Sequence, residues 1–152
     1  MKAAAATLHA LVHIEMPLHV ETCAAHGVSL KALQDTTEAP ENLAYTRYVL
    51  EAGYSGDFLD LMAALAPCVL GYGEIGLRLS GRATPYSAWI ETYAGEGYQS
   101  ACREVGLLID DALDRRLGAG WENSPRWRRL CAHFTTATSL EIGFWDMGLR
   151  AA

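Results

Sequence analysis

The sequence lacks the cysteine patterns of several common classes of protein. Its four cysteines, Cys23, Cys68, Cys102 and Cys131, lie far apart and form no C-x-x-C pair. This spacing indicates neither a zinc site nor a disulfide framework. Four free thiols are typical of a reducing compartment, so we expect a cytoplasmic protein. The 152 residues contain no repeat, low-complexity segment or flexible linker, and they suit a single domain.

Positive charge is also scarce. Lys and Arg total 12 against 18 Asp and Glu, which gives a formal net charge of −6. Phosphate binding depends on clustered Lys and Arg, so this balance argues against a general affinity for nucleic acid or an anionic membrane. The basic cluster RWRR, residues 126–129, is typical of a solvated helix face or an interface rim, and we expect no nucleic-acid partner. The apolar runs fall short of the roughly 20 residues of a membrane span, so we expect no membrane partner.

The first residues resemble a signal peptide only in part. One Lys precedes small apolar residues, but His9, His13 and Glu15 interrupt the apolar run, so we expect a helix of the mature protein. His9 and His13 stand one turn apart, and Glu15 and His19 do so too, which raises the question of a metal. The Glu-x-x-His pairs of a di-metal centre are absent, so we predict solvated histidines and no metal site.

Strand signals are absent as well, whereas helix boundaries recur along the whole chain. We predict an all-α bundle of about six or seven helices. Each expected helix starts or ends at a Ser, Thr, Asp, Pro or Gly. The segment 57–81 should be the longest and most apolar helix, and therefore the central, buried one. The expected helices are 3–25, 29–33, 40–53, 57–81, 84–94, 96–117 and 124–149.

The sequence LAPCVLGY, residues 65–72, puts a proline in the middle of this central helix and a cysteine directly after it. A proline inside a helix removes a backbone hydrogen bond and costs roughly 3 kcal/mol. We expect Pro67 to bend the helix where the Cys68 thiol projects, with Tyr72 one turn further on the same face. This combination can shape a pocket around a reactive thiol. Equally, Cys68 can be a small buried hydrophobic residue, with the nearby glycines serving as packing notches.

A second unusual feature is a carboxylate in an apolar segment. The sequence SLEIGFWDM puts Glu141 among apolar and aromatic residues, with Phe144 and Trp145 on the same helix face. An unpaired buried charge is too costly to keep for stability alone. Glu141 therefore lies either at the helix surface or in a site where it gives and takes a proton.

Four segments, in their order and spacing, resemble those of one known family. They are AYTRYVL (44–50), LMAALAPCVLGYGEIG (61–76), WIETYAGEGYQ (89–99) and LEIGFWDMG (140–148), and they look like the matching segments of the TenA family, also called thiaminase II. Members of that family adopt the all-α haem-oxygenase-like fold without haem, and the resemblance implies no cofactor. They usually assemble as homotetramers. They hydrolyse aminomethylpyrimidine to hydroxymethylpyrimidine and ammonia in thiamin salvage, and they also split thiamin.

Carried over residue by residue, the resemblance implies that Cys68 is the nucleophile and Glu141 the acid/base. An aminopyrimidine is a poor electrophile until a ring nitrogen is protonated, so an acid at Glu141 would activate the ring for attack by the thiolate. Each tyrosine of the matching segments can also be ordinary core. The residues that the resemblance places around the pyrimidine are Tyr45, Tyr72, Tyr93 and Phe144.

The resemblance is incomplete at the N-terminus. Family members are considerably longer there, and the additional helices contribute an aspartate that holds the substrate's amino group and a further aromatic residue. No residue of this sequence matches them. A chain without those helices would expose apolar surface of its central helix, so we expect a homo-oligomer. The alternative function is a non-catalytic module of the same fold that binds a pyrimidine or a partner protein.

Overall fold

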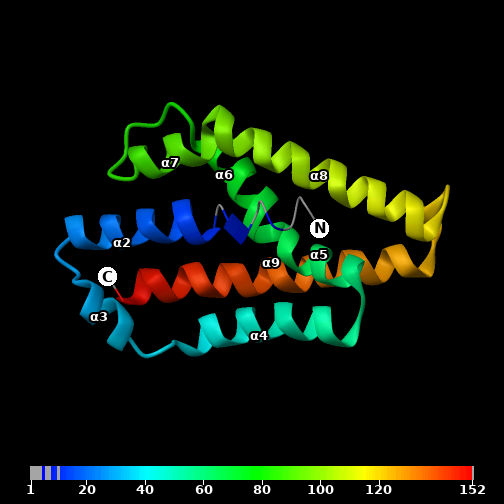
Figure 1. Cartoon of the computed structure of the whole chain (residues 1–152), viewed down its shortest axis with the longest axis horizontal. Coiled ribbons are helices and arrows are strands. Elements are labelled where there is room, and N and C mark those ends of the chain that lie inside the picture. Colours follow the sequence, from blue (N-terminus) through cyan, green and yellow to red (C-terminus); the bar gives the residue numbers. More distant parts are fainter. Residues whose placement is uncertain (1–4, 6–7, 10, 152) are drawn as a thin grey trace. The chain divides into compact units, whose positions relative to one another are not determined.

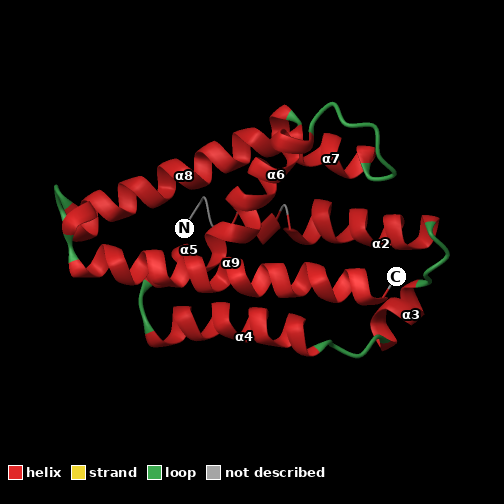
Figure 2. Ribbon diagram, turned by 180° about the vertical axis from the view of Figure 1, so that it is seen from behind, coloured by secondary structure: helices red, strands yellow, loops and turns green. Residues whose placement is uncertain are grey.

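The computed structural model describes residues 5, 8–9 and 11–151, and every regular element within them is a helix (Figures 1 and 2). The all-α class predicted from the sequence is confirmed. The chain forms two compact units, Met1–Glu38 and Ala39–Ala152, each described by itself below.

Over residues 11–38, the first unit contains three short helical elements. Gly27 follows the second of them with a positive φ of 80°, which is the conformation expected of a glycine that ends a helix. The Ser29 hydroxyl accepts a hydrogen bond from the Ala32 amide at 3.1 Å and caps the third. The elements are η1 (Leu11–Glu15), which is a turn of π-helix, α2 (Met16–Ala25) and α3 (Leu30–Asp35).

Three histidines of the first unit contact a side chain one helical turn away. The His9 and His13 rings lie 4.5 Å apart between centroids, and a ring nitrogen of His19 lies 3.5 Å from a Glu15 carboxylate oxygen. Over residues 5, 8–9 and 11–151, no three His, Cys, Asp or Glu side chains gather as a metal site would require.

The second unit holds the remaining helices, and most of their predicted boundaries are confirmed. Asp57 caps its helix in a reciprocal capping box with Asp60, Gly118 ends another with a φ of 75°, and the Ser124 hydroxyl caps the last. The elements are α4 (Pro40–Ser55), α5 (Phe58–Ala66), η2 (Pro67–Gly71, a π-helix), α6 (Tyr72–Leu79), α7 (Ser87–Ala94), α8 (Glu96–Leu117), η3 (Trp121–Asn123, a 3₁₀-helix) and α9 (Pro125–Ala151).

Two expectations about these helices are wrong. The central segment is not the longest helix, because α9 has 27 residues and the central segment has 22. Helix α7 begins at Ser87 rather than at Thr84, because the Thr84 hydroxyl accepts a hydrogen bond from the Tyr86 amide and holds a turn there.

The central segment runs through α5, η2 and α6. Figures 1 and 2 show α8 and α9 spreading apart from the turn at η3, with the central segment crossing between them. It packs against α4, α7, α8 and α9. By length and composition Phe58–Leu79 could cross a membrane, contrary to our expectation that no run is long enough. Its packing on four helices is that of a core helix.

The tightest apolar packing joins α5, α8 and α9. Its buried residues are at most 3% exposed, and the rings of Trp121 and Trp127 lie against them with centroids 4.7 Å apart. These buried residues and the two tryptophans hold α5, α8 and α9 together at the end of the second unit near η3. The buried members are Leu59, Ala112, Leu113 and Leu130.

A buried charge lies beside this core. Asp60 is only 1% exposed, and its carboxylate accepts hydrogen bonds from both Arg126 Nη atoms at 2.6 Å. Arg129 and His133 approach the same carboxylate at 3.3 and 3.2 Å. The bonds from Arg126 hold the pKa of Asp60 well below its usual range. The basic cluster at 126–129 is therefore not simply a solvated face, because two of its arginines pair inside the unit.

Candidate active site

The proline and cysteine of the central segment lie in a turn of π-helix. Pro67 is buried with helical angles, φ −58° and ψ −42°, at the start of η2. A π turn has one residue more per turn, which widens the helix, and Pro67 has no N–H to be satisfied there. The helix thus continues past the proline instead of ending at it. Single π turns inside α-helices occur frequently at functional sites.

The Cys68 thiol is half-buried in this turn and donates a hydrogen bond to the Leu65 carbonyl at 3.1 Å. The buried Tyr45 hydroxyl from α4 lies close to it and to the Glu141 carboxyl of α9. Burial raises the pKa of Tyr45 well above its usual value, and its neighbours Cys68 and Glu141 raise it further. Tyr45 thus remains protonated between a thiol and a carboxyl group.

Glu141 is buried, being 8% exposed, so of the two positions left open by the sequence the structure shows the interior one. Its Oε2 accepts a hydrogen bond from the Tyr72 hydroxyl at 3.2 Å. Burial, reinforced by Glu141, raises the pKa of Tyr72 above its usual value, so this hydroxyl also remains a donor. A carboxyl group with two tyrosine hydroxyls close by can exchange a proton with a bound molecule.

Aromatic rings from two helices, α7 and α9, surround the Tyr72 side chain. The centroids of Trp89, Tyr93 and Trp145 lie 6.0, 5.4 and 5.8 Å from the Tyr72 centroid. Trp89 also stacks on Tyr93 at 4.5 Å. Offset and tilted rings at these distances form stable aromatic groups and offer flat faces to a heterocycle.

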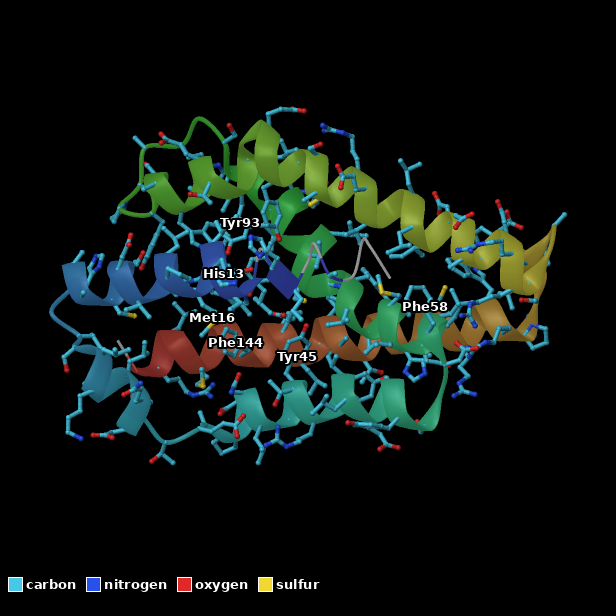
Figure 3. The ribbon with its side chains drawn as sticks, viewed as in Figure 1. His13, Met16, Tyr45, Phe58, Tyr93 and Phe144 are labelled. Atoms are coloured by element: carbon cyan, nitrogen blue, oxygen red, sulfur yellow. The ribbon has the colours of Figure 1, made fainter. Side chains whose placement is uncertain are left out.

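Phe144 lies at the rim of this aromatic group. It contacts the edge of Trp145 with ring centroids 6.4 Å apart. Figure 3 shows Tyr45 and Phe144 close to α9, while Tyr93 comes from α7. All six residues predicted for the site therefore lie in the second unit, and a chain of contacts links Tyr45, Cys68, Glu141, Tyr72 and Tyr93.

Two tryptophans of the site, Trp89 and Trp145, were missed in the sequence. Trp89 precedes Tyr93 by one helical turn, and Trp145 follows Glu141 by one turn, so each shares a helix face with a predicted site residue. That spacing is the signal that could have identified them.

Glycines on α6 let neighbouring helices approach the site. A Cβ atom at Gly76 would lie 2.8 Å from the Ala94 nitrogen and 2.8 Å from the Tyr93 carbonyl carbon, so the α6 and α7 backbones are in contact. This contact brings Tyr93 against Tyr72. The packing-notch interpretation therefore holds for Gly73 and Gly76, whereas a Cβ atom at Gly71 would meet nothing within 4 Å.

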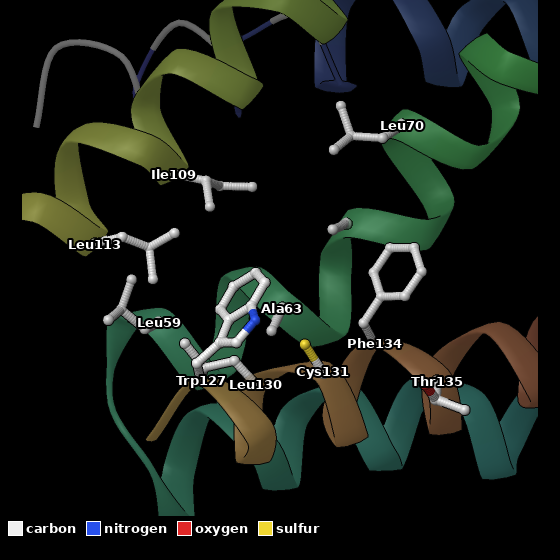
Figure 4. Close-up of a pocket in the computed structure, with 11 residues that line it drawn as sticks. Leu59, Ala63, Leu70, Ile109, Leu113, Trp127, Leu130, Cys131, Phe134 and Thr135 are labelled. Atoms are coloured by element: carbon white, nitrogen blue, oxygen red, sulfur yellow. The ribbon is translucent and has the colours of Figure 1, made fainter. Parts of the chain in front are cut away.

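A hollow of the second unit lies away from these residues. It has a volume of about 470 Å³ between α5, α8 and α9, and its walls are apolar apart from a threonine hydroxyl and a cysteine thiol (Figure 4). No carboxyl, imidazole or tyrosine group lines it, so it offers no acid or base for hydrolysis. The residues that line it include Leu70, Ile109, Trp127, Cys131, Phe134 and Thr135.

The second unit is an all-α bundle in which one tyrosine hydroxyl lies close to both a cysteine and a glutamate, and comparison with known proteins identifies its family. The sequence profile of the TENA/THI-4/PQQC family matches residues 1–151. The chain therefore belongs to this family, which confirms the resemblance seen in the four segments. Solved TenA proteins have the helical haem-oxygenase-like fold, in agreement with the predicted architecture.

Two solved structures are similar over nearly the whole chain. A TenA family transcription regulator from Silicibacter sp. TM1040 is 63% identical with a TM-score of 0.93, over 98% of this chain and 67% of that one. A TenA homologue protein from P. horikoshii OT3 is 25% identical with a TM-score of 0.77, over 95% of this chain and 65% of that one.

Curated relatives are similar as well. An aminopyrimidine aminohydrolase of Halalkalibacterium halodurans is 33% identical over 92% of this chain and 62% of its own length. An uncharacterized protein of Haemophilus influenzae is 36% identical over 91% of this chain and 64% of its own. This chain thus spans a little under two thirds of the length of these relatives.

Proposed function

We propose that this protein is a hydrolase of thiamin salvage. It converts 4-amino-5-aminomethyl-2-methylpyrimidine to hydroxymethylpyrimidine and ammonia, and it also cleaves thiamin. The observation that carries the proposal is the Tyr45 hydroxyl beside both the Cys68 thiol and the Glu141 carboxyl, three groups from three helices. Family membership and the aminopyrimidine aminohydrolases among the relatives support it.

The proposed reaction begins with proton transfer from Glu141 to a ring nitrogen of the substrate. The Cys68 thiolate then adds to a ring carbon and forms a C–S bond. The proton that Cys68 loses on adding to the ring passes to the aminomethyl nitrogen, and the electron pair gained by the ring expels this group as ammonia. Water then adds to the exocyclic methylene and gives one proton to the sulfur as it leaves. Departure of the sulfur restores the aromatic ring, and Glu141 takes back the proton from the ring nitrogen.

The aromatic group gives the substrate its place in this scheme. Tyr72, Tyr93, Trp89 and Trp145 present faces on which a flat pyrimidine can stack. Phe144 closes the rim, and the protonated Tyr45 hydroxyl donates toward the reacting groups. The scheme uses side chains alone and needs no cofactor, and we place the reaction in the cytoplasm.

The test is ammonia release from aminomethylpyrimidine. Cys68→Ser should abolish turnover, because a neutral serine hydroxyl is a far weaker nucleophile than a thiolate. The control is Cys131→Ser, whose exposed thiol lines the other hollow and should not matter. Undiminished turnover in Cys68→Ser would refute the assignment. Tight pyrimidine binding without turnover in the intact wild type would favour the alternative, a non-catalytic pyrimidine-binding module.

We propose no nucleic-acid role, although the Silicibacter relative is described as a transcription regulator. Two arginines of the basic cluster, Arg126 and Arg129, pair with the buried Asp60 and are thus partly neutralised. A mobility-shift assay at physiological salt checks this, since a specific complex there would contradict it.

A further inference from the structure

The π turn that carries Cys68 receives hydrogen bonds from another helix. A π turn interrupts the regular series of backbone hydrogen bonds in the helix, so its carbonyl groups need hydrogen-bond donors from elsewhere. The Val69 carbonyl, one residue after Cys68, accepts from the Tyr98 hydroxyl at 3.1 Å and from the Cys102 thiol at 3.5 Å. Both donors project from α8. One turn further, the Gln99 amide donates to the Gly73 carbonyl at 3.0 Å.

The fit between α8 and the π turn is close. A Cβ atom at Gly73 would lie 2.7 Å from the Cys102 sulfur and 3.3 Å from the Gln99 side-chain nitrogen. Only glycine at this position lets the donors of α8 reach the carbonyls. Burial raises the pKa of Cys102, so its thiol keeps the proton that it donates. Tyr98 is further fixed by edge contact with Tyr93, with centroids 4.7 Å apart.

The register of the site depends on this turn. Each residue of an α-helix rotates the chain by about 100°, so converting the π turn to an α turn would rotate Tyr72 by about that angle relative to Cys68. The Tyr72 hydroxyl could then no longer reach Glu141 while the Cys68 thiol stays near Tyr45. The contacts that stabilise the π turn therefore also keep the Cys68 thiol and the Glu141 carboxyl correctly placed relative to each other.

We propose that Tyr98 and Cys102 are positioning residues, which fix the π turn through the Val69 carbonyl and thereby orient the Cys68 thiol toward the pyrimidine. The proposal rests on the proposed function, in which Cys68 is the nucleophile. Both residues reach the turn through the Val69 carbonyl, so we expect them to act through the backbone.

The test compares variants that remove one donor each. Tyr98→Phe keeps the ring and loses the hydroxyl, Cys102→Ala loses the thiol, and Cys102→Ser restores a donor at the same place. We expect kcat to fall about tenfold in the first two with KM little changed, because small misplacements of reacting groups cost at least this much. Cys102→Ser should recover most of the rate. Tyr86→Phe, at an exposed tyrosine, is the matched control.

A second readout does not depend on turnover. Iodoacetamide labelling, followed peptide by peptide in mass spectrometry, reports the reactivity of each thiol. Labelling of Cys68 should change by about threefold or more in Tyr98→Phe and Cys102→Ala, because a loosened turn alters access to the thiol. Labelling of the exposed Cys131 should stay constant. If the protein proved not to be this hydrolase but the positioning role were correct, the change in Cys68 labelling would still be observed.

Two results would overturn the positioning role. One is wild-type labelling of Cys68 in both Tyr98→Phe and Cys102→Ala, whatever their turnover, because the thiol would then not have moved. The other is a Cys102→Ser variant that behaves like Cys102→Ala in both readouts, because a restored donor would then have no effect.

Discussion

Single residues of the candidate site differ in how far the sequence reveals them. Cys68 and Glu141 are rare types in apolar surroundings, so their chemistry draws attention in the sequence alone. Trp89 and Trp145 each lie one helical turn from a predicted site residue, and this spacing is the signal for them in the sequence, whereas the grouping of their rings around Tyr72 is seen only in the structure. The nearness of Tyr45 to the thiol and carboxyl depends on tertiary packing, which residue spacing does not encode. The roles of these residues stay predictions.

Glu141 should be essential for chemistry and less so for binding. Glu141→Gln keeps the size of the side chain and can still accept the Tyr72 hydrogen bond, but it cannot transfer a proton. We expect kcat to fall by about 10²–10⁴ while pyrimidine affinity changes little. Ammonia release and titration calorimetry measure the two. Glu74→Gln, at an exposed ion pair with Arg78, is the control. A variant with wild-type kcat would contradict the acid/base role.

The two buried tyrosines predict a pH dependence of stability. Burial raises the pKa of Tyr45 and of Tyr72 above the value of about 10 that holds in the unfolded chain. The folded state then binds these protons more tightly, so their contribution to stability is complete below about pH 10 and is lost as the pH rises above it. An ultraviolet titration of the seven tyrosines should show Tyr45 and Tyr72 ionising only with unfolding. Seven ionisations in the native protein would contradict this.

At the scale of helices, the local sequence predicts where a helix begins or ends better than it predicts the form of an irregularity inside the helix. Ser29, Asp57 and Ser124 mark helix starts in the sequence and cap those helices in the structure. The irregularity at Pro67 was predicted as a bend, yet its form as a π turn depends on donors about thirty residues away on α8. Those donors are brought to the turn by packing, so the local sequence could not show them.

The contact between α6 and α7 predicts the effect of filling a notch. Gly76→Ala would push a methyl group against the backbone at Tyr93, so we expect a loss of about 1–3 kcal/mol in the free energy of unfolding. Gly106→Ala on α8 meets nothing within 4 Å and should gain up to about 1 kcal/mol from helix propensity. Urea unfolding compares the two. If Gly76→Ala and wild type had the same free energy of unfolding, α7 would have moved to accommodate the methyl group without loss of stability, and the prediction would be wrong.

The ion pairs that join α5 to α9 predict acid sensitivity. The folded pKa of Asp60 is depressed, so its contribution to stability is present above about pH 4 and is lost as the pH falls below that. Asp60→Asn should cost about 3 kcal/mol at neutral pH, because the facing cations lose their buried partner. Its stability should then depend less on acid than that of wild type. The exposed pair of Asp111 with Arg115 supplies the control, Asp111→Asn. Parallel acid unfolding curves for Asp60→Asn and wild type would contradict the assignment.

For the whole molecule, recurring helix-boundary residues and the lack of strand signals sufficed for the all-α class, and the four family segments sufficed for the haem-oxygenase-like fold. Helices α8 and α9 spread apart from the turn at η3 and form a wedge. The sequence did not predict this wedge, because it arises from how the helices pack on either side of η3. That wedge contains the apolar hollow of about 470 Å³. Large exposed apolar surfaces usually drive association, so we expect the contact of a homo-oligomer to include this hollow.

We therefore predict that the chain assembles through this hollow, as a tetramer by analogy with the family. Light scattering should give a multiple of the 16.5 kDa chain mass. Phe134 lines the hollow and is 42% exposed, so Phe134→Glu should shift the population toward smaller species by burying a charge at the contact. Leu107→Glu changes a residue that is 69% exposed on α8 and lies outside the hollow, so it should leave the mass unchanged. A wild-type chain that remains at 16.5 kDa would contradict assembly, and equal effects of the two variants would place the contact elsewhere.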